Sequence, residues 1–205
     1  MKDGLYRIIK RMIDVIGSLV GLIVFSPVII VIIIAIKLDD GQEIIFKQKR
    51  VGKDEKEFVM YKFISMIPNA HAKRDQLMDL NQTAGPIFKI QQDPRMTKVG
   101  AFLRVHSLDE IPQFINVLKG DMSMVGPRPA LPEEVQEYTD AEFARLQVLP
   151  GLTGLWQVSG RSNLTYQEMI SLDIAYIEDK NIILDLVIIW KTVLQMFTPS
   201  KSGAF

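Results

Sequence analysis

The sequence predicts a mostly helical α+β protein attached to a membrane, and three observations predict it. A long uncharged apolar segment lies near the N-terminus, a short β-rich hairpin follows it, and later apolar residues recur mainly at helical spacing. With 205 residues the chain has the length of one domain, so we expect a single unit over residues 1–205.

The apolar segment runs from Val15 to Ile36 without a charge. As a helix of about 22 residues it would extend about 33 Å, enough to match a bilayer core. Pro27, which follows Ser26, removes the hydrogen bond to the carbonyl of Ile23 and predicts a kink. A kinked span and a broken hairpin that enters and leaves by one face both fit this pattern.

Basic residues flank both ends of the segment and therefore favour neither orientation. In the hairpin interpretation, Asp14 would neutralise Lys10 and Arg11 near the lipid boundary. These residues, with Ser26 and Pro27, are the candidate membrane-hairpin residues.

After the membrane segment, residues 43–48 and 58–63 are expected strands joined by a turn at residues 51–54. A further short strand is expected at residues 87–90. Helices are expected over residues 70–80, 97–105, 111–118, 132–138, 140–148, 165–180 and 182–197. The last could be a core helix, or an amphipathic helix at the membrane interface with Trp190 near the headgroups. Stretches 120–132 and 150–160 are rich in Gly or Pro and are expected loops, the second either a ligand loop or a plain connector.

Composition excludes several classes of function. The chain has no cysteine and two histidines, so it has no thiol nucleophile and no basis for a zinc centre. Acidic and basic residues number 24 each, and no net field points to nucleic acid.

Asp109 lies within a polar run from Arg104 to Gln113. Ser107 and Glu110 have capping-box spacing, so the acids could simply occupy a first helical turn. Pro112 favours a helix start a few residues later, which leaves Asp109 at or just before a helix N-terminus. Because amides at a helix start bind phosphate oxygens, a carboxylate there would lie beside a phosphorus electrophile.

Adjacent carboxylates repel each other unless a cation lies between them. Arg104 or a divalent metal would fill this role for Asp109 and Glu110, and oxygen-only ligands favour Mg²⁺, with Asp109 as a metal ligand.

Two further arginines occur in rigid or glycine-rich surroundings. Arg128 lies in Gly126-Pro127-Arg128-Pro129, and Arg161 ends the stretch from Pro150. A guanidinium offers a two-pronged contact to phosphate, although the four-residue motif taken alone favours a structural turn with a surface arginine. Trp156 is expected in the core.

Together these motifs resemble the bacterial sugar transferases, also called monotopic polyprenyl-phosphate phosphoglycosyl transferases. The resemblance covers about Tyr6 to Phe205, and residues 85–90 and 203–205 resemble the hexose-1-phosphate type. The motifs occur in one order: Lys10-Arg11-x-x-Asp14, Ser26-Pro27, Tyr61-Lys62-Phe63, residues 107–113, residues 117–123, Gly126-Pro127-Arg128-Pro129 and residues 150–161.

The resemblance implies a re-entrant helix-break-helix over about residues 10–38 and a catalytic part over about residues 43–205. It implies a location at the cytoplasmic face of the bacterial inner membrane. It further implies transfer of hexose 1-phosphate from a UDP-sugar to undecaprenyl (polyprenyl) phosphate, with release of UMP, to initiate exopolysaccharide, capsule or O-antigen-type assembly.

The resemblance also implies the roles of the site residues. Asp109 would attack phosphorus and carry the phosphosugar, and Glu110 would hold Mg²⁺ or accept a proton. Lys62, Arg104, Arg128 and Arg161 would neutralise the diphosphate.

Two alternatives are a lipid glycosyltransferase that releases UDP and an inactive membrane-anchored scaffold. The sequence leaves both a monomer and a homo-oligomer open.

Overall fold

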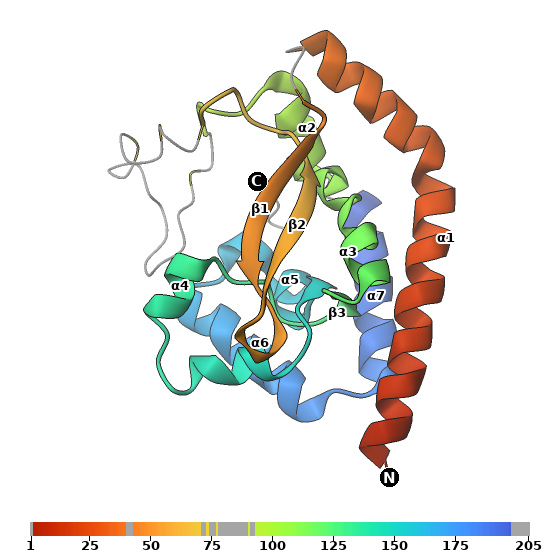
Figure 1. The fold of residues 1–205 in the computed structure, drawn as a ribbon, viewed down its shortest axis with the longest axis vertical. Coiled ribbons are helices and arrows are strands. Elements are labelled where there is room, and N and C mark those ends of the chain that lie inside the picture. The colour runs from red at the N-terminus through yellow and green to blue at the C-terminus, as the bar shows by residue number, and fades with distance from the viewer. Residues whose placement is uncertain are drawn as a thin grey trace.

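The computed structural model describes residues 2–39, 43–70, 73, 77, 90 and 93–197. It confirms a mostly helical α+β fold with two small sheets (Figure 1). The helices and strands in chain order are α1 (Lys2–Asp39), β1 (Ile45–Val51), β2 (Glu57–Phe63), α2 (Lys98–Val105), α3 (Gln113–Lys119), β3 (Ser123–Val125), α4 (Pro132–Gln136), β4 (Gly151–Thr153), α5 (Leu155–Ser159), α6 (Tyr166–Asp179) and α7 (Ile182–Phe197).

Most expected elements are confirmed. Strands β1 and β2 form the expected antiparallel hairpin, paired from Ile45 with Phe63 to Val51 with Glu57. Helix α7 has the expected bounds, and the expected helix at residues 140–148 is a 3₁₀-helix, Glu142–Gln147. The helix expected at 70–80 lies mostly outside the described residues, as do residues 85–89 and 203–205.

The expectation of a loop over residues 150–160 is wrong, because this stretch contains β4 and α5. Strand β4 pairs in parallel with β3, which lies in the other expected loop. A Cβ at Gly151 would overlap the backbone nitrogen of Gly126, so the two strands can approach this closely only without side chains there. The glycines thus serve a long-range pairing that a local pattern does not show.

The expected break at Ser26-Pro27 is also wrong, because α1 is continuous from Lys2 to Asp39 with Pro27 inside it. The Ser26 hydroxyl donates a hydrogen bond of 2.7 Å to the carbonyl of Ile23. This is the carbonyl that Pro27, four residues later, cannot pair with. The serine therefore satisfies the freed acceptor within an apolar helix, as serines do beside prolines in membrane helices.

The polar residues in the N-terminal half of α1 bind the folded part of the chain. Asp14 accepts hydrogen bonds from the Ser123 hydroxyl (2.9 Å) and the Met124 amide (2.8 Å) at β3. Arg11 donates to the carbonyls of Val117 (2.7 Å) and Leu118 (2.8 Å) near the C-terminus of α3. Among the described residues no ion pair within 4.0 Å joins Asp14 to Arg11 or Lys10, although both cations still act on Asp14 electrostatically. The direct partners of Asp14 are the donors of β3.

Lys10 lies close by and binds another part of the fold. Its ammonium donates to Asp185 of α7 (2.9 Å), to the Tyr176 hydroxyl (3.1 Å) and to the Val125 carbonyl (3.0 Å). Because Asp185 is buried, this ion pair fixes α7 against α1 and β3.

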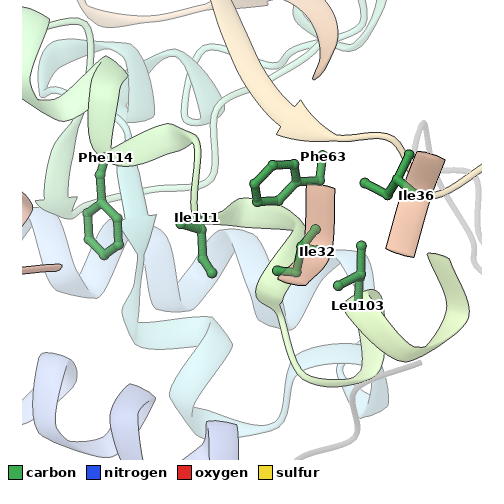
Figure 2. Packing of buried hydrophobic residues seen from close by; sticks show 6 residues of the cluster. All are labelled: Ile32, Ile36, Phe63, Leu103, Ile111 and Phe114. Carbon is green, nitrogen blue, oxygen red and sulfur yellow. The ribbon is translucent and has the colours of Figure 1, made fainter. Parts of the chain in front are cut away.

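The C-terminal half of α1 packs by apolar contact. Ile32 and Ile36 lie against Phe63 of β2, Leu103 of α2 and Ile111 before α3 (Figure 2). Both halves of α1 therefore contact the same folded part, and α1 runs along one side of the molecule (Figure 1).

The outer face of α1 is apolar and exposed. By length and composition alone, the stretch from Gly4 to Asp39 could cross a membrane. Helix α7 adds further exposed apolar residues, including Trp190 and Phe197, at 63% and 81% exposure. An apolar surface of this extent is typical of a membrane contact.

We expect Asp14→Ala to destabilise the protein by about 3 kcal/mol, because the buried hydroxyl of Ser123 and the amide of Met124 lose a charged acceptor. Thermal unfolding of detergent-solubilised protein would measure this. Asp54→Asn, on the exposed turn of the hairpin, is the control and should leave the midpoint unchanged. Equal midpoints for Asp14→Ala and wild type would contradict the role of Asp14.

We expect Ser26→Ala to cost about 1 kcal/mol in the presence of Pro27 and close to nothing in a Pro27→Ala background. In that background the amide of residue 27 supplies the missing hydrogen bond to Ile23. The measurement is a double-mutant cycle of thermal stability in detergent, and equal costs in both backgrounds would show that the serine does not act on this carbonyl.

Candidate active site

The segment before α3 holds Asp109 and Glu110 in a 3₁₀-turn, Leu108–Glu110. Ser107 adopts a left-handed conformation (φ 55°) and makes no side-chain cap, so the capping box is absent. Helix α3 begins at Gln113 after Pro112, which confirms the later helix start that the proline predicted. Ile111 and Leu108 pack in the apolar cluster of Figure 2 and fix the turn that carries the acids.

The two acids share one lysine. The Lys62 ammonium on β2 lies 2.7 Å from a carboxylate oxygen of Glu110 and 3.9 Å from one of Asp109. Asp109 is 4% exposed, whereas Glu110 reaches a pocket that Lys62 also lines. The structure therefore brings three of the predicted site residues together, with Asp109 the deepest.

The surroundings separate the pKa values of the two acids. Burial raises the pKa of Asp109. The positive charges of Lys62 and Arg104 lower it and the negative charge of Glu110 raises it, and the net shift is upward. Burial alone would also raise the pKa of Glu110. The ion pair with Lys62 and the charges of Arg161 and Arg104 outweigh this effect and hold the pKa of Glu110 below its usual range. Such a separation is typical of acid pairs with different catalytic roles.

The predicted arginines occupy different positions. Arg104 of α2 and Arg161, which has a φ of 49°, both lower the pKa of Glu110 electrostatically. Arg128 lines the same pocket but makes a two-pronged ion pair with Glu134, at 2.8 and 3.1 Å. Burial lowers the pKa of Arg128, but the ion pair with Glu134 outweighs burial, so the net effect is a raised pKa. Arg128 is therefore already neutralised by Glu134, as Lys62 is by Glu110.

Arg50 is a pocket residue that sequence reasoning missed. It is 8% exposed and donates to the carbonyl of Pro129 and the amide oxygen of Gln48, while its Nε has no partner. Among the described residues no carboxylate lies within ion-pair distance of it. Burial and the nearby charge of Arg128 lower the pKa of Arg50 to about 9.

A buried cation without a carboxylate is costly unless an anion joins it. One feature of the sequence could have identified Arg50. Successive side chains of a strand point to opposite faces, so Arg50 of β1 lies on the face opposite the exposed Lys47 and Lys49.

Three uncharged polar side chains also line this pocket: Gln113, Trp156 and Gln157. The expectation that Trp156 lies in the core is wrong, because α5 presents it to the pocket. Nothing in the local sequence distinguishes these residues from ordinary helix residues, since α3 and α5 come to line one pocket only in the tertiary fold.

The remaining predicted residues lie elsewhere. Three of them, Lys10, Arg11 and Asp14, form hydrogen bonds with β3 and α3. The other two, Ser26 and Pro27, lie on the exposed face of α1. In the part of the chain that the structure describes, no group of three or more His, Cys, Asp or Glu side chains is arranged to hold a metal.

The fold and the site define a class of protein in which two adjacent acids, one buried and one partly exposed, lie with several cations beside a pocket. This domain is attached to a long apolar helix. A family model described as bacterial sugar transferase matches residues 5–199. The chain belongs to the bacterial sugar transferase family.

Three relatives illustrate the similarity. The galactosyl transferase CpsE of Streptococcus agalactiae is 44% identical over 92% of this chain and 42% of its own length. The exopolysaccharide production protein ExoY of Rhizobium meliloti is 38% identical over 90% of this chain and 83% of its own. The undecaprenyl-phosphate galactose phosphotransferase of Salmonella typhimurium is 40% identical over 91% of this chain and 40% of its own. The chain thus spans about two fifths of the length of two of these relatives and most of ExoY.

We expect Lys62→Met to move the acid limb of the pH–activity profile to higher pH and to reduce kcat/KM by about 100-fold. Lys62 lowers the pKa of both acids, so its loss raises these pKa values. A nucleophilic carboxylate is active above its pKa and loses activity as the pH falls through it. The assay is transferase turnover across pH, with Lys49→Met on the exposed face of β1 as the control. An unshifted acid limb would contradict this electrostatic role of Lys62.

Proposed function

We propose that this chain is a phosphoglycosyl transferase that moves hexose 1-phosphate from a UDP-sugar to polyprenyl phosphate and releases UMP. The observation that carries the proposal is that the buried Asp109 and the partly exposed Glu110 lie together beside a pocket lined by Lys62, Arg50 and Arg128. The names of the relatives support the substrates, since one is an undecaprenyl-phosphate galactose phosphotransferase and another a UDP-glucose:undecaprenyl-phosphate glucose-1-phosphate transferase. The name of ExoY, an exopolysaccharide production protein, supports a role in exopolysaccharide assembly, and we propose that this role is its initiation.

In the first step a carboxylate oxygen of Asp109 attacks the sugar-proximal phosphorus. A bond forms between this oxygen and phosphorus, and the bond from phosphorus to the bridging oxygen breaks, so UMP leaves with the electron pair. The raised pKa of Asp109 makes its carboxylate a stronger base, and therefore a better nucleophile, once it has lost its proton. Lys62, Arg104 and Arg161 stabilise the charge that builds on the phosphates and keep Glu110 ionised.

In the second step an oxygen of polyprenyl phosphate attacks the same phosphorus. Asp109 leaves as a carboxylate, and the product is a polyprenyl diphosphate hexose. Glu110 borders the pocket as an ionised carboxylate and is the group that would accept the proton of the incoming lipid phosphate. Arg50 supplies an unneutralised positive charge to the diphosphate, whereas Arg128 is held by Glu134 and acts mainly by shaping the pocket.

Mg²⁺ fits this site by the chemistry of its donors. Mg²⁺ in phosphoryl-transfer sites is commonly held by one or two carboxylates together with substrate phosphates, and Asp109 and Glu110 are such a pair. When bound, the ion would neutralise phosphate charge and relieve the repulsion between the two carboxylates.

The membrane arrangement follows from the contacts of α1. Tyr6 and Lys10 near its start bind Asp185, and Ile32 and Ile36 near its end enter the apolar cluster. A helix held to one domain at both ends cannot cross a bilayer as an isolated span, which supports attachment from a single face. Basic residues near both ends favour the cytoplasmic face of the inner membrane, where UDP-sugar and lipid phosphate would meet at the exposed apolar surface.

We expect Asp109→Asn to lower turnover by more than about 1,000-fold while the protein stays folded, because the amide keeps the shape and loses the nucleophile. Wild type incubated with UDP-hexose alone should release one UMP per active site, and the peptide that contains Asp109 should gain the mass of a hexose phosphate. The matched variant Glu110→Gln should slow the cycle and still form this adduct.

Several results would reject this assignment. UDP in place of UMP would identify a glycosyltransferase, and no product from wild type with a panel of UDP-hexoses would identify an inactive scaffold. An adduct on Glu110 would move the nucleophile to the neighbouring residue.

A further inference from the structure

The inner part of the pocket contains an unusual concentration of unpartnered polar atoms. Gln113 Nε2, Trp156 Nε1 and Gln157 Oε1 are buried and have no hydrogen-bond partner, and the Nε of Arg50 shares this property. In the described part of the chain six buried side-chain atoms lack partners, and these four belong to residues that line the one pocket. Gln113 is 3% exposed, so water does not substitute freely.

Unpartnered buried polar atoms destabilise a fold, and folded proteins rarely keep several together without a reason. The atoms lie just beneath the pocket surface, and small rotamer changes on binding would present them to a ligand. Their concentration at one pocket therefore indicates a binding site for a polar ligand.

The chemistry of these atoms indicates what the ligand offers. Gln113 and Trp156 present N–H donors, and Gln157 presents an acceptor because its amide nitrogen donates to the Leu152 carbonyl. A phosphate oxygen accepts hydrogen bonds and would leave the Gln157 oxygen unused. A hydroxyl group both donates and accepts, so a group with several hydroxyls matches the mixed set.

The position of Gln113 favours the hexose over the nucleoside. Gln113 begins α3 four residues after Asp109, and it lines the pocket together with Glu110, the residue next to the proposed nucleophile. The hexose is attached to the phosphorus that Asp109 would attack. The uracil ring also carries both hydrogen-bond donors and acceptors, but a second phosphate and a ribose separate it from this phosphorus.

We propose that Gln113, Trp156 and Gln157 form a subsite that binds the hydroxyl groups of the transferred hexose and determines which hexose is accepted. This inference rests on the proposed function and adds the residues that select its sugar. The unpaired Arg50 borders the subsite and would hold the adjoining phosphates.

The test uses Trp156→Phe in the full chain, because phenylalanine keeps an aromatic ring and removes the N–H. Trp190→Phe, which alters the chain's second tryptophan on the exposed face of α7, is the matched control. The measurements are kcat/KM by UMP release with UDP-glucose, UDP-galactose and their monodeoxy analogues, and inhibition by UMP. Gln157→Leu, which removes the acceptor, is the second variant, and thermal unfolding verifies that each variant is folded.

We expect Trp156→Phe to lower kcat/KM about 10-fold for the preferred UDP-hexose, the factor that corresponds to 1.4 kcal/mol. With the analogue that lacks the partner hydroxyl, variant and wild type should be equal. Inhibition by UMP should stay within about two-fold, because UMP carries no hexose.

Weaker UMP inhibition with unchanged preference among hexoses would assign these residues to the nucleoside and overturn the proposal. Equal kcat/KM for wild type and both variants with every substrate would also overturn it. Wild type that releases no UMP from any UDP-hexose would overturn the proposed function itself, and the subsite with it.

Discussion

The fold depends on the polar attachment of α1 to the catalytic part. Asp14 binds β3, Arg11 donates to carbonyl groups near the C-terminus of α3, and Lys10 forms an ion pair with Asp185. Charges buried beside an apolar helix are tolerated only with partners of this kind, so the attachment is specific in register and direction. Because α3 follows directly after the acid pair, the helix that contacts the membrane also positions the proposed nucleophile.

The charge balance of the site follows a similar constraint. Two adjacent carboxylates cannot both be buried and ionised at low cost, and Lys62 stabilises the more exposed Glu110 more strongly than Asp109. Arg128 is neutralised by Glu134, whereas Arg50 keeps an uncompensated charge at the pocket. The site is therefore arranged to gain most of its electrostatic stabilisation when an anionic substrate arrives.

Much of the candidate site could be predicted because its charged residues lie in short local motifs. Asp109, Glu110 and Lys62 lie together, with Arg104 and Arg161 acting on them electrostatically. Arg50, Gln113 and Gln157 were missed because each lies in an ordinary helix or strand pattern. They converge through the parallel pairing of β3 with β4, whose partners are separated by 28 residues at Ser123 and Gly151.

The sequence by itself determined the helical periodicity, the hairpin, the long apolar segment and the acid pair before a helix start, because these depend on neighbouring residues. The tertiary structure decided whether α1 breaks at Pro27, which partners Asp14 and Arg11 take, and which polar atoms meet at the pocket. These outcomes depend on contacts between distant segments. The Ser26 hydroxyl bonds the freed carbonyl, and the attachment of α1 at both ends keeps it along the domain.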